Sequence, residues 1–199
     1  SLQRAGLIDQ MKAEGIEWLN VFSVDNVLQN IGDPVFIGAT IAQGHAVGAK
    51  VIAKTNPEEK VGAICLRNGR PSVVEYSELT EEMRNAVDEN GNYKYHFGVT
   101  LNYLFHVPTM EERAVGRLPI HKANKKIACI NEAGEPVIPS EPNGYKLETF
   151  IFDILGVFDG VTSFEVVRED EFAPIKNKVG VDSLETAREL LTRKTGIEL

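Results

Sequence analysis

The chain has 199 residues, of which 43% are hydrophobic and 25% charged, a composition typical of a soluble globular protein long enough to bury a core. Its 21 basic and 29 acidic residues give a net charge of −8. This charge argues against broad binding to nucleic acid or an anionic membrane, because both need a basic surface. No apolar run approaches the ~18–20 residues of a membrane span, and no signal peptide opens the chain, so we expect a cytoplasmic protein.

Hydrophobic periodicity predicts helices along the chain, with residues suited to cap or end them. Segment 1–15 has a period near 3.6 residues and stops at Gly15. Segment 34–44 follows Asp33, a suitable N-cap, and starts with Pro34, which favours the first helical position. Further helices are predicted from residue 77, over 147–158 and over 183–195.

Short apolar runs between turn residues predict strands at 18–24, 49–54, 62–67, 72–76 and 163–167. The pair Asn68-Gly69 predicts a hairpin between two of these strands. Residues 93–105 predict a strand followed by a short helix, whereas the polar, proline-rich segment 108–144 predicts a long excursion with a hairpin around 132–135. Strands that alternate with helices indicate an α/β fold, with a mixed β-sheet flanked by helices.

Cysteine and histidine spacing gives no sign of a metal site. Cys65 and Cys129 sit in apolar stretches and are expected to be small buried hydrophobic residues of a reducing compartment. The four histidines have no metal-ligand spacing, and neither of the common glycine-rich phosphate loops is present.

Three short segments carry residues suited to chemistry. Asp25 follows an apolar strand, where a carboxylate can hold Mg²⁺, although Asp-Asn is also typical of a turn or helix cap. Glu75 and Glu78 end another strand and could accept hydrogen bonds from sugar hydroxyls, or Glu78 could support a helix start. The run from Arg168 is either a solvated charged loop or a segment held by Phe172, Pro174 and Ile175 that aims Lys176 at a phosphate.

Six motifs occur in an order that resembles one enzyme family. They are Val24-Asp25-Asn26, Asp33-Pro34-x-Phe36-Ile37-Gly38, Lys54-Thr55-Asn56-Pro57-x-Glu59-x-Val61-Gly62, Val73-Val74-Glu75-Tyr76-Ser77-Glu78, Pro142-Asn143-Gly144-x-Lys146-x-Glu148-x-Phe150-x-Phe152-Asp153 and Arg168-Glu169-Asp170-Glu171-Phe172-x-Pro174-x-Lys176-Asn177. Nearly the whole chain resembles the eukaryotic-type UDP-N-acetylhexosamine pyrophosphorylases and their bacterial relatives. The last motif is closer to the N-acetylhexosamine branch than to the UDP-glucose branch.

The resemblance implies a nucleotide-diphospho-sugar transferase (Rossmann-like) fold and the Mg²⁺-dependent reaction of UTP with a sugar 1-phosphate, which gives a UDP-sugar and pyrophosphate. By the same resemblance, Asp25 binds the metal and the phosphates near the uridine, and Lys176 contacts the sugar phosphate. The implied sugar-binding residues are Gly62 through its backbone, Glu75 through its carboxylate, Asn102, and Phe150 and Phe152 around the 2-substituent. Aromatic residues at positions i and i+2 are also typical of a core.

The sequence departs from the family pattern in two places. The family's Gly-Gly-x-Gly-Thr-Arg-Leu-Gly loop, which holds the UTP phosphates, is absent, so we expect residues 1–199 to form one incomplete catalytic domain that is inactive alone. Where the family has Asn-Ala-Gly-Asn, this chain reads His96-Phe97-Gly98-Val99, with Asn102 retained three residues on. Valine cannot make the hydrogen bond of the second asparagine, so the sugar is left open.

Two alternatives to an N-acetylglucosamine 1-phosphate uridylyltransferase follow from these departures. One is a glucose 1-phosphate or broad-range UDP-sugar pyrophosphorylase. The other is a non-catalytic sugar-nucleotide-binding domain. The presence of Asp25, Glu75 and Lys176 together counts against it, because a domain that only binds would not need a metal carboxylate. The sequence makes no prediction of the oligomeric state.

Overall fold

The computed structural model describes residues 2–114 and 116–198, which divide into two compact units. Unit 1 comprises the chain up to Val115 and again from Leu155, and unit 2 comprises Gly116–Ile154. The predicted single catalytic domain stays a prediction. Within the described residues, no helix combines the length and the apolar character that a membrane span requires.

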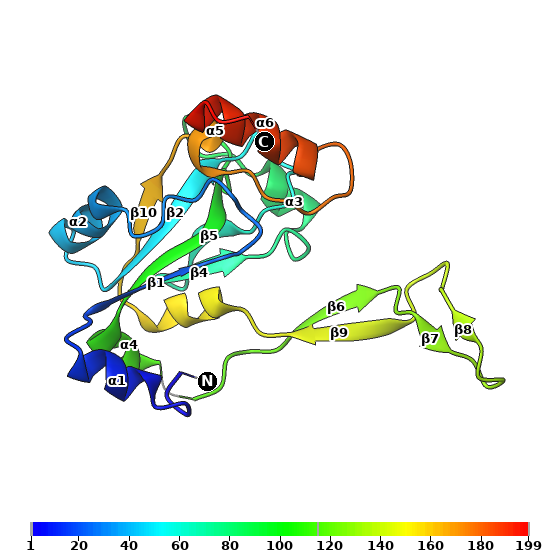
Figure 1. Cartoon of the computed structure of the whole chain (residues 1–199), viewed down its shortest axis with the longest axis horizontal. Coiled ribbons are helices and arrows are strands. Elements are labelled where there is room, and N and C mark those ends of the chain that lie inside the picture. The colour runs from blue at the N-terminus through cyan, green and yellow to red at the C-terminus, as the bar shows by residue number, and fades with distance from the viewer. Residues whose placement is uncertain (1, 115, 199) are drawn as a thin grey trace. The chain divides into compact units, whose positions relative to one another are not determined.

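A mixed sheet forms the centre of unit 1 (Figure 1). Its strands are β1 (Trp18–Phe22), β2 (Val47–Ala53), β3 (Ala63–Arg67), β4 (Arg70–Val74), β5 (Phe97–His106) and β10 (Thr162–Glu165). The order is β10-β2-β5-β3-β4, and β1 also pairs with β5. β10 lies parallel to β2, whereas β1, β2 and β3 each lie antiparallel to β5. The carboxyl ends of β1, β2 and β10 therefore point to the same edge of the sheet.

Helices surround this sheet as the alternating pattern predicted. They are α1 (Leu7–Ala13), α2 (Pro34–Ala42), α3 (Glu81–Asn85), α4 (Val107–Arg113), α5 (Arg168–Glu171) and α6 (Leu184–Thr195). Figure 1 shows α5 and α6 beyond the carboxyl end of β2, while α2 lies beside β2 and β10. The most deeply buried large side chains include Phe36, Tyr103, Phe105, Phe158 and Leu155.

Several local signals are confirmed. Asp33 caps α2 by accepting hydrogen bonds from the backbone amides of Val35 and Phe36. Asn68 and Gly69, both with positive φ, turn the chain between β3 and β4. The helix predicted over 183–195 forms as α6, which Ser183 caps in a reciprocal capping box. These features depend on neighbours in sequence, which is why the sequence alone predicted them.

Two predicted helices are wrong in part. The short helix expected at the end of 93–105 is strand, because β5 continues to His106 and α4 starts only at Val107. This part of β5 is buried between β1 and β2, so both faces carry apolar residues and the alternation that marks a strand is lost. The helix expected over 147–158 is instead strand as far as Glu148, followed by a 3-10 helix η1 (Ile151–Val157).

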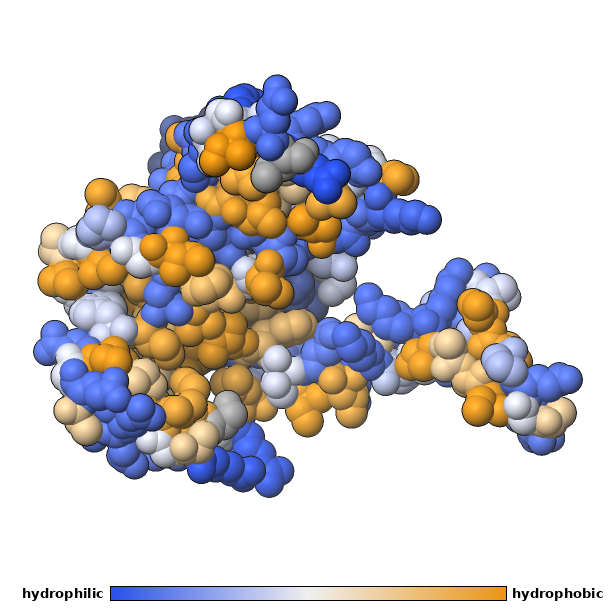
Figure 2. Space-filling view, viewed as in Figure 1, coloured by the Kyte–Doolittle hydropathy of each residue, from blue (hydrophilic) through white to orange (hydrophobic). Residues whose placement is uncertain are grey.

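Unit 2 contains most of the excursion predicted over 108–144, but the prediction is wrong for its first residues, which belong to helix α4. Strands β6 (His121–Lys125) and β9 (Gly144–Glu148) pair antiparallel, as do β7 (Cys129–Ile130) and β8 (Pro136–Val137), with the predicted turn between the latter two. Pairing with β6 explains why the sequence around 147 is strand. Figure 2 shows hydrophobic residues on the surface of these hairpins, and Ile138 is 88% exposed.

The two cysteines differ in environment, so the expectation of two buried thiols is wrong for Cys129, which is exposed. Its short strand lies in a two-stranded hairpin that has no second layer within unit 2. Cys65 on β3 is partly buried, and this burial raises the pKa of its thiol.

A buried ammonium lies in the middle of β2. Lys50 is 1% exposed, and its Nζ lies 2.8 Å from Oδ2 of Asp33 and 2.6 Å from Oε2 of Glu171. The ammonium also lies 5.6 Å from the centre of the Phe36 ring. Lys50 therefore fixes both the start of α2 and the end of α5 against the sheet.

Asp33 is the carboxylate whose ionisation this arrangement controls. Burial acts to raise the pKa of Asp33, but the hydrogen bond and charge of Lys50, with the backbone amides of Val35 and Phe36, lower it below its ordinary value of 3.8. A lowered folded-state pKa means that ionised Asp33 stabilises the fold above its unfolded pKa. That contribution is lost as the pH falls through the folded-state value.

An Asp33→Asn variant tests this charge. The amide keeps an oxygen for capping α2 but cannot form an ion pair with Lys50, so we expect its unfolding free energy near neutral pH to fall by roughly 1–3 kcal/mol. Between about pH 5 and pH 3 the variant should lose less stability than the unchanged chain, because it lacks the group that titrates. Chemical denaturation across this pH range measures both effects, and parallel pH profiles for the two proteins would contradict the assignment.

Candidate active site

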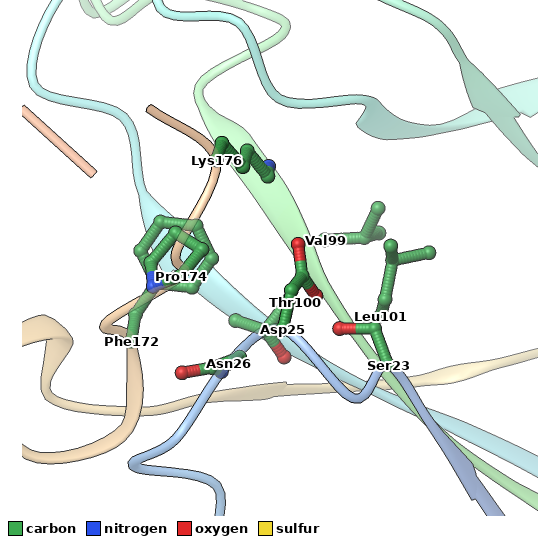
Figure 3. A pocket seen from close by; sticks show the side chains of 9 residues that line it. All are labelled: Ser23, Asp25, Asn26, Val99, Thr100, Leu101, Phe172, Pro174 and Lys176. Carbon is green, nitrogen blue, oxygen red and sulfur yellow. The ribbon is translucent and has the colours of Figure 1, made fainter. Parts of the chain in front are cut away.

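A small cavity lies at the carboxyl end of β1, where three segments far apart in sequence meet (Figure 3). Its volume of about 20 Å³ is room for a water molecule or a small ion. The lining residues are Ser23, Asp25, Asn26, Val99, Thr100, Leu101, Phe172, Pro174 and Lys176. We call it the Asp25 cavity. It brings together the two residues that the sequence predicted to be catalytic, Asp25 and Lys176.

Asn26 joins the two sides of the Asp25 cavity. Its side chain is buried, with Nδ2 donating to the backbone oxygen of Glu171 at 2.8 Å and Oδ1 accepting from the amide of Ala173 at 2.8 Å. Oδ1 also accepts from the amide of Leu28 at 3.4 Å, so a turn, which was one alternative for this Asp-Asn pair, forms around Asn26. The Val24-Asp25-Asn26 motif contains Asn26, but its contacts to residues 145 and 147 positions away leave no local signal in the sequence.

Backbone hydrogen bonds also join the segment around Asp25 to the segment that leads to Lys176. The amide of Ile175 donates to the oxygen of Asp25 at 2.9 Å, and the amide of Val27 donates to that of Ala173 at 3.4 Å. Phe172, Ala173 and Pro174 are buried, whereas Lys176 is exposed. The apolar residues of this charged run therefore anchor it, as one of the two interpretations expected, and a contact of Lys176 with a phosphate stays a prediction.

A bulge in β5 shapes the floor of the Asp25 cavity. The ladder with β2 pairs Ala49 with Tyr103 and then Val51 with Val99, so Thr100 and the residues after it bulge out of the regular register. Leu101 at the bulge has φ 55°, a conformation unfavourable for a leucine. The Thr100 hydroxyl donates to the oxygen of Lys50 at 3.1 Å, and the amide of Ser23 donates to that of Leu101 at 3.0 Å. These contacts end β1 and turn the chain towards Asp25.

A second group of predicted residues lies next to Val99 and is called the Gly62 cluster (Gly62, Glu75, Val99). The amide of Val99 donates to the oxygen of Gly62 at 2.9 Å. A Cβ on Gly62 would lie 2.9 Å from a methyl carbon of Val73 and 3.2 Å from Oε1 of Glu75, so glycine is required there. Because Val99 also lines the Asp25 cavity, this cluster adjoins it.

Glu78 serves a turn and not a helix start. Its Oε2 accepts from the amide of Glu75 at 3.4 Å, while the oxygen of Glu75 accepts from the amides of Glu78 and Leu79. Helix α3 starts later, at Glu81, with Thr80 as its cap. The turn holds Glu75 at the end of β4, beside Gly62.

Asn102 does not line the Asp25 cavity. It is 1% exposed, and its Oδ1 accepts from Nδ2 of Asn20 at 2.8 Å across the β1–β5 pair. Its own Nδ2 is buried without a hydrogen-bond partner in the part of the chain that the structure describes. A role for Asn102 in binding sugar stays a prediction, and its position here joins two strands.

Phe150 and Phe152 belong to an aromatic group in unit 2. Their rings stack with centroids 4.8 Å apart, and the His121 ring lies 4.8 Å from that of Phe150. Nε2 of His121 lies 3.0 Å from Oδ2 of Asp153, which also accepts from the amide of Phe150 at 3.3 Å. Phe152 is buried and Phe150 half-buried, so the core alternative remains for Phe152. The sequence did not predict His121 as a neighbour.

Comparison with known proteins settles the family. The family described as UTP--glucose-1-phosphate uridylyltransferase matches residues 1–196. The chain belongs to this family. The mouse (Mus musculus) UDP-N-acetylhexosamine pyrophosphorylase-like protein 1 is 42% identical over 86% of this chain, and the Saccharomyces cerevisiae UDP-N-acetylglucosamine pyrophosphorylase is 38% identical over 92% of it.

A solved structure supports the same family. The UDP-N-acetylglucosamine pyrophosphorylase of Trypanosoma brucei, in complex with an inhibitor, superposes with a TM-score of 0.77 at 30% identity over 94% of this chain. The nucleotide-diphospho-sugar transferase fold is therefore confirmed. The chain covers 34% of the mouse protein, 40% of the yeast protein and 37% of the trypanosome chain.

The Asp25 cavity suits a magnesium ion of the kind expected in this uridylyltransferase family. The Asp25 carboxylate makes no hydrogen bond or ion pair with any other residue that the structure describes. The described residues also contain no group of three or more His, Cys, Asp or Glu side chains placed to hold a metal. Mg²⁺ is commonly held by one or two carboxylates together with substrate phosphates, so a single free carboxylate fits.

An Asn26→Asp variant tests the junction beneath the cavity. The carboxylate would face the backbone oxygen of Glu171 without a proton to donate, and we expect the unfolding free energy to fall by roughly 1–3 kcal/mol. Asn85→Asp is a matched control, because its Nδ2 donates to a backbone oxygen at 2.9 Å in an exposed position. Urea denaturation of both variants measures the difference. Equal losses of unfolding free energy in the two variants would mean that the hydrogen bonds of Asn26 do not hold the two segments together.

Proposed function

We propose that this chain is the sugar- and phosphate-binding part of a uridylyltransferase that transfers UMP from UTP to a sugar 1-phosphate, giving a UDP-sugar and pyrophosphate. The observation that carries the proposal is the meeting of Asp25 and Lys176 in one cavity next to the Gly62 cluster. Its partners are then UTP or UDP-sugar and the sugar 1-phosphate. The proposal includes the cytoplasmic location expected from the composition.

The reaction needs positioned charge more than a covalent catalyst. A phosphate oxygen of the sugar 1-phosphate attacks the α-phosphorus of UTP, the bond to the bridging oxygen breaks, and pyrophosphate leaves with the electron pair. Lys176 is suited to contact the sugar phosphate, where its charge offsets the repulsion between the two anions. Asp25 is the residue that would hold Mg²⁺, which supplies positive charge beside the phosphates when it is bound.

The Gly62 cluster is suited to the sugar. Glu75 supplies a carboxylate that can accept hydrogen bonds from sugar hydroxyls. Gly62 lets the Glu75 carboxylate pack against its backbone, and it stays the proposed backbone contact by the family resemblance. We propose N-acetylglucosamine 1-phosphate as the sugar phosphate, supported by the names of the yeast and trypanosome relatives. Phe150 and Phe152 are the proposed contacts of the 2-substituent.

One observation favours a second candidate, a glucose 1-phosphate or broad-range enzyme. Val99 occupies the position next to Gly62 where the family pattern has an asparagine, and it is 5% exposed. An apolar side chain there provides no hydrogen bond to distinguish sugars. The sugar preference is therefore the part of the proposal that most needs measurement.

Removing the lysine charge tests the phosphate contact. Isothermal titration of the chain with UDP-N-acetylglucosamine and Mg²⁺ should show binding weakened by roughly 10- to 100-fold in Lys176→Ala, because a charge-assisted hydrogen bond is lost. Lys178→Ala is the control, since this lysine is exposed and lies two residues further on. Identical affinities for the two variants would remove Lys176 from the site, and no binding to the unchanged chain would count against the proposed function.

Restoring an asparagine tests the sugar preference. Val99→Asn places an amide beside Gly62, and we expect the ratio of affinities for UDP-N-acetylglucosamine and UDP-glucose to rise by about tenfold. Affinity for UMP, which lacks the sugar, should stay unchanged and serves as the control. A ratio that does not move would mean that Val99 does not face the sugar.

A further inference from the structure

Two charged residues that the proposed reaction leaves unused, Glu59 and Arg168, form an ion pair between two of the motifs. Nη2 of Arg168, at the start of α5, lies 2.7 Å from Oε1 and 2.9 Å from Oε2 of Glu59, in the loop between β2 and β3. The two side chains are 25% and 16% exposed, so the pair is largely shielded from water. A charge-assisted contact to both carboxylate oxygens in such a place is stronger than a surface pair.

Each partner of this pair also holds its own segment. Nη2 of Arg168 donates to the oxygen of Ala53 at 3.1 Å, at the end of β2. Oε2 of Glu59 accepts from the amide of Thr55 at 2.7 Å and from its hydroxyl at 3.1 Å. The pair therefore fixes the loop that follows β2 against the helix that follows β10.

The residues next to this pair lead to both parts of the candidate site. The guanidinium of Arg168 lies 5.3 Å from the centre of the Phe172 ring, and Phe172 lines the Asp25 cavity. Phe172 packs in one apolar cluster with Val61, the residue before Gly62. A shift of Arg168 against Glu59 would therefore move the segment carrying Lys176 relative to Gly62.

We propose that Arg168 and Glu59 are positioning residues that set the spacing between the Asp25 cavity and the Gly62 cluster. Neither residue lines the cavity, so they act through Phe172 and Val61. This step rests on the proposed function, in which Lys176 contacts the phosphate and the Gly62 cluster contacts the sugar. The ion pair would then fix the distance between these two contacts. A sugar 1-phosphate joins these two groups by one bond and tolerates little change in that distance.

Amide hydrogen exchange tests the positioning without any ligand. The amide of Val99, bonded to the oxygen of Gly62, reports on the Gly62 cluster, and that of Ile175, bonded to the oxygen of Asp25, reports on the cavity. In Glu59→Gln we expect both amides to exchange roughly tenfold faster, since a charged pair is lost. Amides in the β1–β5 ladder should keep their rates.

The neighbouring glutamate is a matched control. Glu58 lies in the same loop as Glu59, and its side chain is 68% exposed. Its Oε2 lies 3.0 Å from Nη1 of Arg84, so Glu58→Gln removes an ion pair at the surface. It should leave both reporter amides unchanged. Exchange that rises in Glu59→Gln only within the loop 54–60, or rises equally in both variants, would overturn the positioning role.

A charge swap and a titration complete the test. Glu59→Arg combined with Arg168→Glu should restore slow exchange at both amides if the pair itself is what matters. With UDP-N-acetylglucosamine, Glu59→Gln should bind about tenfold more weakly while UMP binding stays unchanged. If the charge swap restores slow exchange but the chain binds no UDP-sugar, the positioning role is upheld and the proposed function is rejected. Failure of the positioning role and failure of the proposed function are therefore distinguishable.

Discussion

The buried ammonium of Lys50 is the interaction on which the site depends. A charge that is 1% exposed cannot be left unpaired, and the two carboxylates that meet it come from opposite ends of the chain, Asp33 before α2 and Glu171 at the end of α5. An apolar residue of similar size could supply comparable stability, but it would not select these two partners. The ion pairs thus specify which segments lie over the centre of β2.

The candidate site follows from that choice. With Glu171 held by Lys50, its backbone oxygen is in place for Asn26, and the residues after it run beside the turn that carries Asp25. The bulge opposite Lys50 shapes the other side of the cavity. Leu101, in the left-handed conformation, lies where the pairing of β1 with β5 ends, and it lines the cavity. The strain at Leu101 is tolerated because β2 and the chain after β1 both bond to the bulge.

Local charge would allow an acidic chain to bind the anionic substrates of the proposed reaction. The net charge of −8 describes the whole surface, whereas the Asp25 cavity combines one lysine with one carboxylate suited to a divalent cation. The Arg168–Glu59 pair adds no net charge at the site and contributes geometry instead. The proposed phosphate binding depends on where a few charges are held, and composition gives no measure of that.

The sequence by itself determined the features that depend on near neighbours. These are the capped helices, the Asn68-Gly69 hairpin, the α/β class and, through ordered motifs, the family and the candidate residues Asp25, Gly62, Glu75 and Lys176. It failed where long-range pairing overrode local pattern, as in β5 and β9, and for Cys129 in a hairpin without a second layer. Only the tertiary structure decided that Asn26 joins Asp25 to the Lys176 segment and that Asn102 is buried away from the cavity. Those contacts join residues that are distant along the chain, so no local periodicity records them.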